Sequence, residues 1–111
     1  MTGKKLNLGL WHRFVLSGLV GNLKDCSIAQ ARTGSQILDL IQVTDEEATE
    51  CGVTIDPDGV LSWQKSEERE FFFNEEQFAM LKLVVESHRG WRPADWKLLE
   101  ALLKQMEEKN E

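Results

Sequence analysis

The 111-residue sequence has little cysteine, little proline and no long hydrophobic run. Its two cysteines, Cys26 and Cys51, match no CxxC spacing, and no secretory hydrophobic segment precedes them. We therefore expect two reduced, separately buried thiols in a cytoplasmic protein. The apolar stretches are far shorter than the roughly 20 residues of a membrane-spanning helix, so no membrane partner is expected. Both histidines are distant in sequence from the cysteines, and we predict no metal site and no cofactor.

The chain is too short for two separate cores, since a domain normally needs roughly 100 residues. Hydrophobic residues make up 41% of the sequence, which is typical of a globular protein and argues against wholesale disorder. We expect a single domain over residues 1–111, in which residues 107–111 form a frayed polar tail.

Basic residues are absent from residues 33–64, although the whole chain carries 13 Lys and Arg against 19 Asp and Glu. The same segment holds seven acids: Asp39, Asp45, Glu46, Glu47, Glu50, Asp56 and Asp58. An acidic chain is repelled by phosphates, so direct DNA binding is not expected. The acidic segment is either a solvated face that keeps the protein soluble or a face for a basic partner. In the second case the binding residues would be Asp39, Asp45, Glu46, Glu47 and Glu50.

Residues 7–18 are predicted as a first helix, with Asn7 as its N-cap. Apolar side chains surround most of it and leave His12, Arg13 and Ser17 as the solvent-exposed edge. Because a domain of this size has little depth in which to bury such a helix, we expect a homodimer through Trp11, Phe14 or the C-terminal helix.

Two capping boxes predict the next two helices. Ser27 and Gln30 begin one of them, in which Gly34 would either permit a close approach of another helix or mark a bend. The sequence Thr44-Asp45-Glu46-Glu47 begins a short helix that Gly52 ends. Its consecutive acids would lie at the positive end of the helix dipole, which is a structural reason for their presence.

The hydrophobic period then changes from 3.6 to 2. Two short β-rich runs flank Asp56-Pro57-Asp58-Gly59, which predicts a hairpin over residues 53–63 with a type I turn and a bulge. A third strand is expected near residues 69–73, which would complete a small antiparallel meander.

The C-terminal part is predicted to be a helical hairpin. Asn74 and Gln77 make a capping box, and Phe73 would pack on Phe78 as a hydrophobic staple. Pro93 suits the first turn of the last helix, where Trp91 and Trp96 would form a second staple. The predicted class is α+β: three N-terminal helices, a small antiparallel meander, then two helices.

Between the last two helices lies a cluster that could hold an anion or a nucleotide. It joins an imidazole, an indole and three cations: His88, Arg89, Trp91, Arg92 and Lys97. Such groups could stack a base and bind phosphate. The same types of residue also anchor protein interfaces, and a helix turn with ordinary surface arginines is the simpler interpretation.

Evidence for catalysis is weak, and we assign no catalytic residue. Cys26 lies next to a helix N-terminus, a setting in which thiols can be reactive, but neither cysteine has the sequence context of a catalytic nucleophile. A small hydrolase that uses Cys26 or His88 is therefore the least favoured function.

Several motifs together resemble a known class. They are the Leu16 to Gly21 turn after a basic, aromatic helix, the run Leu40-Ile41-Gln42-Val43-Thr44-Asp45-Glu46-Glu47, the strand Leu61-Ser62-Trp63 and the run Glu70-Phe71-Phe72-Phe73. This pattern resembles small uncharacterised accessory proteins encoded among the short reading frames of tailed phages. The resemblance implies a phage accessory role in which a small protein acts stoichiometrically by binding. We therefore expect a non-enzymatic, counter-defence protein that binds and inhibits a host protein in the host cytoplasm through the acidic segment from Asp39 to Asp58. The alternative is a sponge that sequesters a nucleotide signal or another small anionic molecule.

Overall fold

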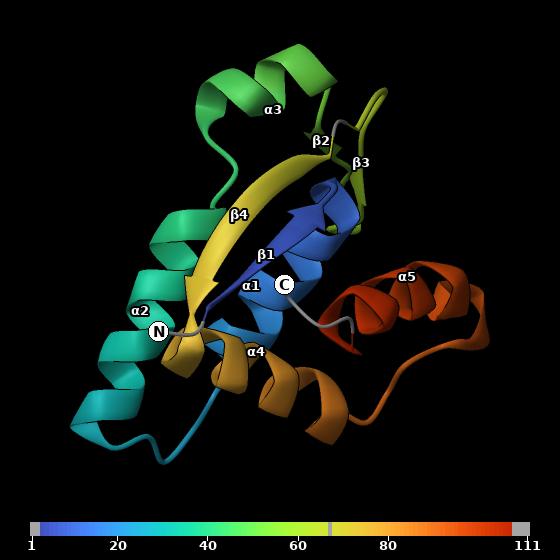
Figure 1. The fold of residues 1–111 in the computed structure, drawn as a ribbon. Helices are drawn as coiled ribbons and strands as arrows, with labels where there is room; N and C mark the ends of the chain where they lie inside the picture. The colour runs from blue at the N-terminus through green and yellow to red at the C-terminus, as the bar shows by residue number, and fades with distance from the viewer. Residues whose placement is uncertain (1–2, 67, 108–111) are drawn as a thin grey trace.

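The computed structural model describes residues 3–66 and 68–107 (Figure 1). The elements in chain order are β1 (Gly3–Leu8), α1 (Leu10–Gly21), α2 (Ile28–Ile41), α3 (Asp45–Cys51), β2 (Thr54–Ile55), β3 (Leu61–Ser62), β4 (Arg69–Asn74), α4 (Glu75–Ser87), the 3₁₀-helix η1 (Pro93–Asp95) and α5 (Trp96–Glu107). The α+β class is therefore confirmed. Of the predicted tail, Glu107 ends α5, and residues 108–111 lie outside the described residues.

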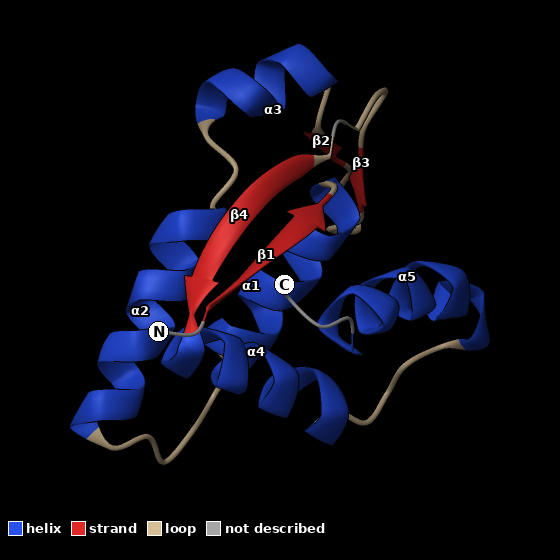
Figure 2. Cartoon of the chain, viewed as in Figure 1, coloured by secondary structure: helices blue, strands red, loops and turns tan. Residues whose placement is uncertain are grey.

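The predicted meander is wrong. A strand is present at Arg69–Asn74, as expected, but it does not join the hairpin. It pairs antiparallel with β1, from Gly3 opposite Asn74 to Leu8 opposite Arg69, while β2 and β3 form a separate two-stranded sheet (Figure 2). The first helix accordingly begins at Leu10 after the N-cap Gly9, and a strand replaces its predicted first turn.

Strand β1 is explained by the alternation of buried and exposed side chains along Gly3–Leu8. Leu6 and Leu8 point into the core, whereas Lys5 and Asn7 are exposed on the opposite face. Lys4 breaks the pattern because it is buried on the inner side. Its Nζ donates to the backbone oxygen of Met106 at 3.0 Å and therefore neutralises the negative end of α5.

The main core lies between the inner face of the β1–β4 sheet and helices α1, α2, α4 and α5. Its fully buried members include Leu6, Leu16, Ile37, Ile41, Phe73, Leu81 and Leu102. Gly34 is buried where α2 passes α1 and α4, and a Cβ there would lie 3.4 Å from a methyl group of Val20 on α1 and 3.6 Å from the sulfur of Met80 on α4, which are ordinary van der Waals distances. The structure therefore does not require glycine at this position for close approach.

Helix α5 covers the outer edge of β1. The side-chain amide of Gln105 accepts from the backbone N–H of Asn7 at 2.7 Å and donates to its carbonyl oxygen at 2.9 Å. This amide therefore replaces a third strand on that edge. Further along α5, the backbone oxygen of Leu98 accepts from Nε2 of His12 at 2.9 Å. Nδ1 of His12 is buried, and no described residue forms a hydrogen bond with it.

The predicted capping boxes and the glycine that ends α3 are confirmed. Ser27, Thr44 and Asn74 each form the predicted capping box with the Gln or Glu three residues later. Gly52 ends α3 with a φ of 67°, in the left-handed region that glycine tolerates. In the hairpin turn, Gly59 has a φ of 84° and donates its backbone N–H to the oxygen of Asp56 at 2.9 Å.

The staple between Trp91 and Trp96 is wrong. Trp96 is half exposed, whereas Trp91 packs on His88 with ring centroids 4.7 Å apart and on Trp11 with centroids 6.4 Å apart. The indole N–H of Trp91 also donates to the backbone oxygen of Val85 at 3.4 Å. Trp91 therefore fixes the α4–α5 connection through contacts with α1 and α4.

The predicted solvent edge of the first helix is also wrong. His12 and Arg13 are buried, because α5 covers one and the α2–α3 connection covers the other. Trp11 and Phe14 are half-buried, the first against Trp91 and the second against Trp63 at 5.7 Å. Other parts of the same chain thus cover much of α1, although Phe14 also lines an apolar groove between α1 and α4, and the homodimer stays a prediction.

No helix within residues 3–66 and 68–107 combines the length and the apolar character needed to cross a bilayer.

Candidate functional site

The short helix α3 stands at one end of the molecule, beside the hairpin (Figure 1). Its capping box satisfies first-turn N–H groups, since the hydroxyl of Thr44 accepts from the backbone N–H of Glu47 at 3.1 Å. Asp45, Glu46 and Glu47 occupy the first turn, as the helix dipole favours. The end of α3 is tied to the segment after β3, because the oxygen of Cys51 accepts from the N–H of Gln64 at 2.8 Å.

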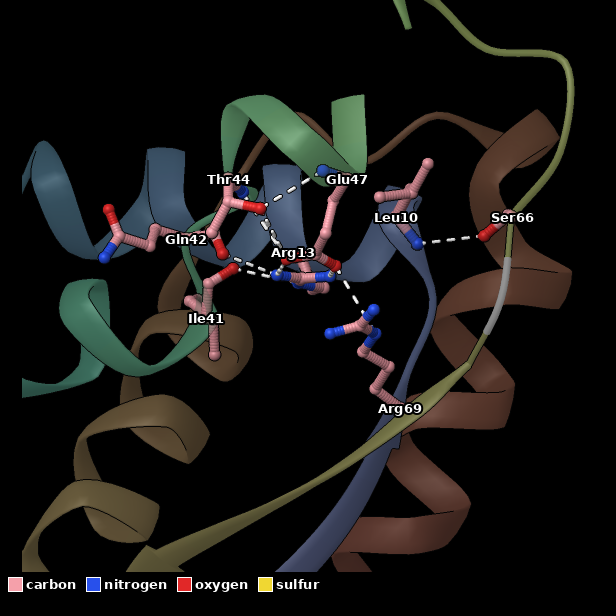
Figure 3. A network of polar contacts seen from close by, with 8 residues as sticks. All are labelled: Leu10, Arg13, Ile41, Gln42, Thr44, Glu47, Ser66 and Arg69. Carbon is pink, nitrogen blue, oxygen red and sulfur yellow. Dashed lines mark hydrogen bonds and ion pairs between the residues drawn. The ribbon is translucent and has the colours of Figure 1, made fainter. Parts of the chain in front are cut away.

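A buried arginine anchors α3 to the core (Figure 3). The guanidinium of Arg13 is 2% exposed and binds the carboxylate of Glu47 with two hydrogen bonds, of 2.7 and 3.0 Å. It also donates to the backbone oxygens of Ile41, at 2.9 Å, and Gln42, which lie at the end of α2. The guanidinium carbon of Arg13 lies 5.2 Å from the ring centroid of Phe71 on β4. One side chain on α1 therefore holds the end of α2, the start of α3 and a strand.

Arg69 completes this cluster from the start of β4, with its Nε 3.4 Å from the Glu47 carboxylate. Hydrogen bonding to Arg13 lowers the pKa of Glu47 from the ordinary value of 4.5 to about 2, although burial opposes the shift. A hydrogen bond from the Thr44 backbone and the charge of Arg69 act in the same direction as Arg13. Glu47 is thus a structural anion with three partners inside the fold. Glu47 was predicted to lie on an exposed partner-binding face, whereas the structure places its carboxylate against Arg13.

Because the pKa of Glu47 is lowered on folding, its ionised form contributes stability that is present above pH 4.5 and lost as the pH falls towards 2. We expect Glu47→Gln to be less stable than the wild type at pH 7, and this difference to shrink on acidification. Urea unfolding at pH 7, 4.5 and 3 measures it. Glu46→Gln, at an exposed position next to Glu47, is the control and should show a small difference throughout. A deficit for Glu47→Gln that stays constant from pH 7 to 3 would contradict the assignment.

The other acids predicted for partner binding are all exposed: Asp39, Asp45, Glu46 and Glu50. Three of them, with Thr49, line a shallow open depression of about 400 Å³ on α3. Of the seven acids in residues 33–64, Glu47 alone is drawn inward. We call Asp39, Asp45, Glu46 and Glu50 the acidic face.

Apolar side chains are exposed near this face. On the hairpin, which follows α3, Ile55 is 69% and Val60 is 57% exposed, and Leu61 is also exposed. On α2, Leu40 is exposed next to Asp39. The sequence did not predict this combination, because the hairpin was expected to form a meander with the strand near residues 69–73 and instead forms a separate sheet.

The structure brings together two of the five residues predicted for an anionic ligand. His88 and Trp91 are in contact, and His88 also lines a groove of about 370 Å³ between α1 and α4. The other walls of that groove are mostly apolar, and none of the three cations lines it. Arg92 lies 3.5 Å from Asp95, and Arg89 and Lys97 are exposed elsewhere on the connection and on α5. A convergent phosphate site is therefore not formed here.

The thiols differ from each other. Cys51 is buried as expected, whereas Cys26 is exposed, contrary to the prediction of two buried thiols, because it lies in the loop before α2. Within the described residues, no group of three or more His, Cys, Asp and Glu side chains is arranged to bind a metal ion.

Comparisons with protein-family models, with curated proteins and with solved structures find no match to this chain.

Proposed function

We propose that the protein is a non-enzymatic binding protein whose acidic face binds a partner with a basic surface. The observation that supports the proposal is a group of exposed acidic side chains around α3, a helix that an ion pair holds against the core. Six of the seven acids in residues 33–64 are exposed, no basic residue lies among them in sequence, and the one inward acid ties α3 to the core through Arg13. An acidic surface that is already ordered attracts a basic partner at a low entropic cost.

The partner should also offer apolar surface. Ile55, Val60 and Leu40 are exposed beside or within the acidic region, and interfaces combine such apolar contacts with a polar rim. The resemblance to short tailed-phage proteins suggests a host protein as this partner, which would be inhibited stoichiometrically in the host cytoplasm.

We expect the triple variant Asp45→Asn/Glu46→Gln/Glu50→Gln to associate with its partner about tenfold more slowly, with a smaller change in dissociation. The reason is that long-range attraction is lost, and salt should act similarly, since the Debye length falls to about 3 Å at 1 M. The partner is first captured from host lysate on the wild-type protein. Association is then measured by surface plasmon resonance at low and high salt.

The matched control is Arg89→Ala/Arg92→Ala, which removes charge from the α4–α5 connection and should leave association nearly unchanged. Circular dichroism of each variant checks that α3 is intact, because its first-turn acids also favour the helix dipole. If the triple variant binds like the wild type while the arginine variant fails, the acidic face is not the binding site.

A second candidate is the nucleotide sponge, which the contact between His88 and Trp91 beside the α1–α4 groove favours. Protein purified without denaturation would then carry material absorbing near 260 nm, and His88→Ala, at the one predicted ligand residue that lines the groove, would reduce it.

A further inference from the structure

The two edges of the β1–β4 sheet differ. The amide of Gln105 occupies the outer edge of β1 by bonding both backbone groups of Asn7, as described above. Helix α2 packs near β4 and Gln77 caps Asn74 at one end of its outer edge, but within residues 3–66 and 68–107 no side chain bonds that edge at Glu70 or Phe72 in the way that Gln105 bonds Asn7. An open edge presents backbone donors and acceptors that can pair with another extended segment.

The register identifies which atoms face outward from β4. Because both backbone groups of Asn7 point away from β4, its opposite residue Glu70 has its N–H and C=O pointing away from β1. The alternation continues, so the backbone groups of Phe72 and Asn74 also point outward. Asn74 agrees with this alternation, because its N–H bonds the side chain of Gln77 at 3.0 Å and not the backbone of β1.

Two residues remain with free edge groups. Among the described residues, none forms a hydrogen bond with the outward N–H or C=O of Glu70 or Phe72. These groups are spaced for a short antiparallel or parallel partner strand. The side chain of Phe72 is 50% exposed and lies over Gly3, which supplies an apolar contact next to the same edge.

The charges near this edge of β4 indicate which side chains a partner strand would carry. The start of β4 is joined to α3 by the 3.4 Å contact between Arg69 and Glu47, and α3 lies on the side of β4 away from β1 in Figure 1. Asp45 and Glu46 are exposed in the same first turn of α3 as Glu47, so acidic side chains lie near the start of this edge. Glu70 adds a further exposed acid, which Lys5 contacts weakly at 3.9 Å.

We infer that an extended, lysine- or arginine-bearing segment of the partner pairs with β4 through the outward backbone groups of Glu70 and Phe72. This inference rests on the proposed function, because the acidic face supplies the charge that selects a basic segment. A second copy of this chain is a poorer occupant, since pairing β4 with itself would bring two acidic faces together.

The test uses a blocked nine-residue peptide in which lysine and valine alternate, together with the same peptide carrying N-methyl groups on alternate backbone nitrogens. Amide hydrogen exchange of the ¹⁵N-labelled protein is followed by NMR. We expect the amides of Glu70 and Phe72 to exchange quickly in the free protein and at least tenfold more slowly with the first peptide. The methylated peptide should give no protection, because it cannot complete the ladder.

A proline variant gives an independent measurement. Glu70→Pro removes one outward N–H without removing a β1–β4 hydrogen bond, so binding should weaken at least tenfold. Glu70→Gln keeps the N–H and removes the same charge, and it should weaken binding by less than threefold. If Glu70→Pro does not fold, the exchange experiment on the wild-type protein decides the question.

The outcomes separate the two proposals. If the peptide binds in a salt-dependent way that requires Asp45, Glu46 and Glu50, yet leaves the Glu70 and Phe72 amides unprotected, strand addition is wrong and the acidic face stands. No binding of the peptide at millimolar concentration also overturns strand addition. Protection that rises with protein concentration alone assigns the edge to a second copy and overturns the peptide as occupant. Peptide and partner binding that survive the triple variant overturn the acidic face.

Discussion

Replacing Arg13 with alanine is expected to lower the free energy of unfolding by about 3–5 kcal/mol, a large part of the 5–15 kcal/mol typical of a domain. Arg13 is buried, and its loss leaves the carboxylate of Glu47 and the backbone oxygens of Ile41 and Gln42 without their main donor. Urea unfolding followed by tryptophan fluorescence measures the effect.

Arg69→Ala is the matched control. Arg69 contacts the same carboxylate, but its side chain is half exposed, so its removal should cost less than about 1 kcal/mol. In a double-mutant cycle, Arg13→Ala and Glu47→Ala should be strongly non-additive because each leaves the other's charge uncompensated. Additive effects of the two substitutions, or a stable Arg13→Ala protein, would contradict the described role of this ion pair.

Phe73→Ala should cost about 3–5 kcal/mol, the range for truncation of a fully buried phenylalanine. Phe73 is 0% exposed and is the largest of the fully buried side chains. It lies in the strand directly before α4, so the cavity would open where sheet and helices meet. Thermal unfolding by calorimetry reads the loss as a fall in the melting temperature.

The neighbouring residue provides the comparison. Phe72 points to the opposite face of β4 and is half exposed, so Phe72→Ala should cost about 1 kcal/mol or less. If the two substitutions cost the same, the assignment of inner and outer faces to β4 is wrong, and the edge parity used for strand addition fails with it.

Capping boxes predicted the starts of α2, α3 and α4 correctly, whereas the N-cap predicted for α1 was wrong. Each capping box and the turn at Asp56–Gly59 depends on residues within four positions, and those positions are visible in sequence. β1 was missed although Leu6 and Leu8 alternate with Lys5 and Asn7. The plausible N-cap at Asn7 and the buried Lys4 hid a pattern of period 2, and its partner strand lies more than 60 residues away.

The candidate site could be predicted only as a composition. The absence of basic residues from 33–64 marked the acidic region, but sequence alone could not separate Glu47 from Glu46. That separation depends on Arg13, which precedes Glu47 by 34 residues. An arginine inside an apolar helix was the available signal, because such a residue needs a buried partner when the helix lies in the core. The open edge of β4 left no mark in the sequence, since it depends on which strands pair.

The pairing of Gln105 with Asn7, across 98 residues of sequence, has a consequence for biosynthesis. During synthesis, β1 can pair only after residues 69–74 have been made, and Gln105 can bond its outer edge only after α5 has been made. Contacts of such high sequence separation slow folding. Early chains therefore hold an unpaired segment with Leu6 and Leu8, and unpaired apolar strands of this kind are prone to aggregate until their partners have been synthesised.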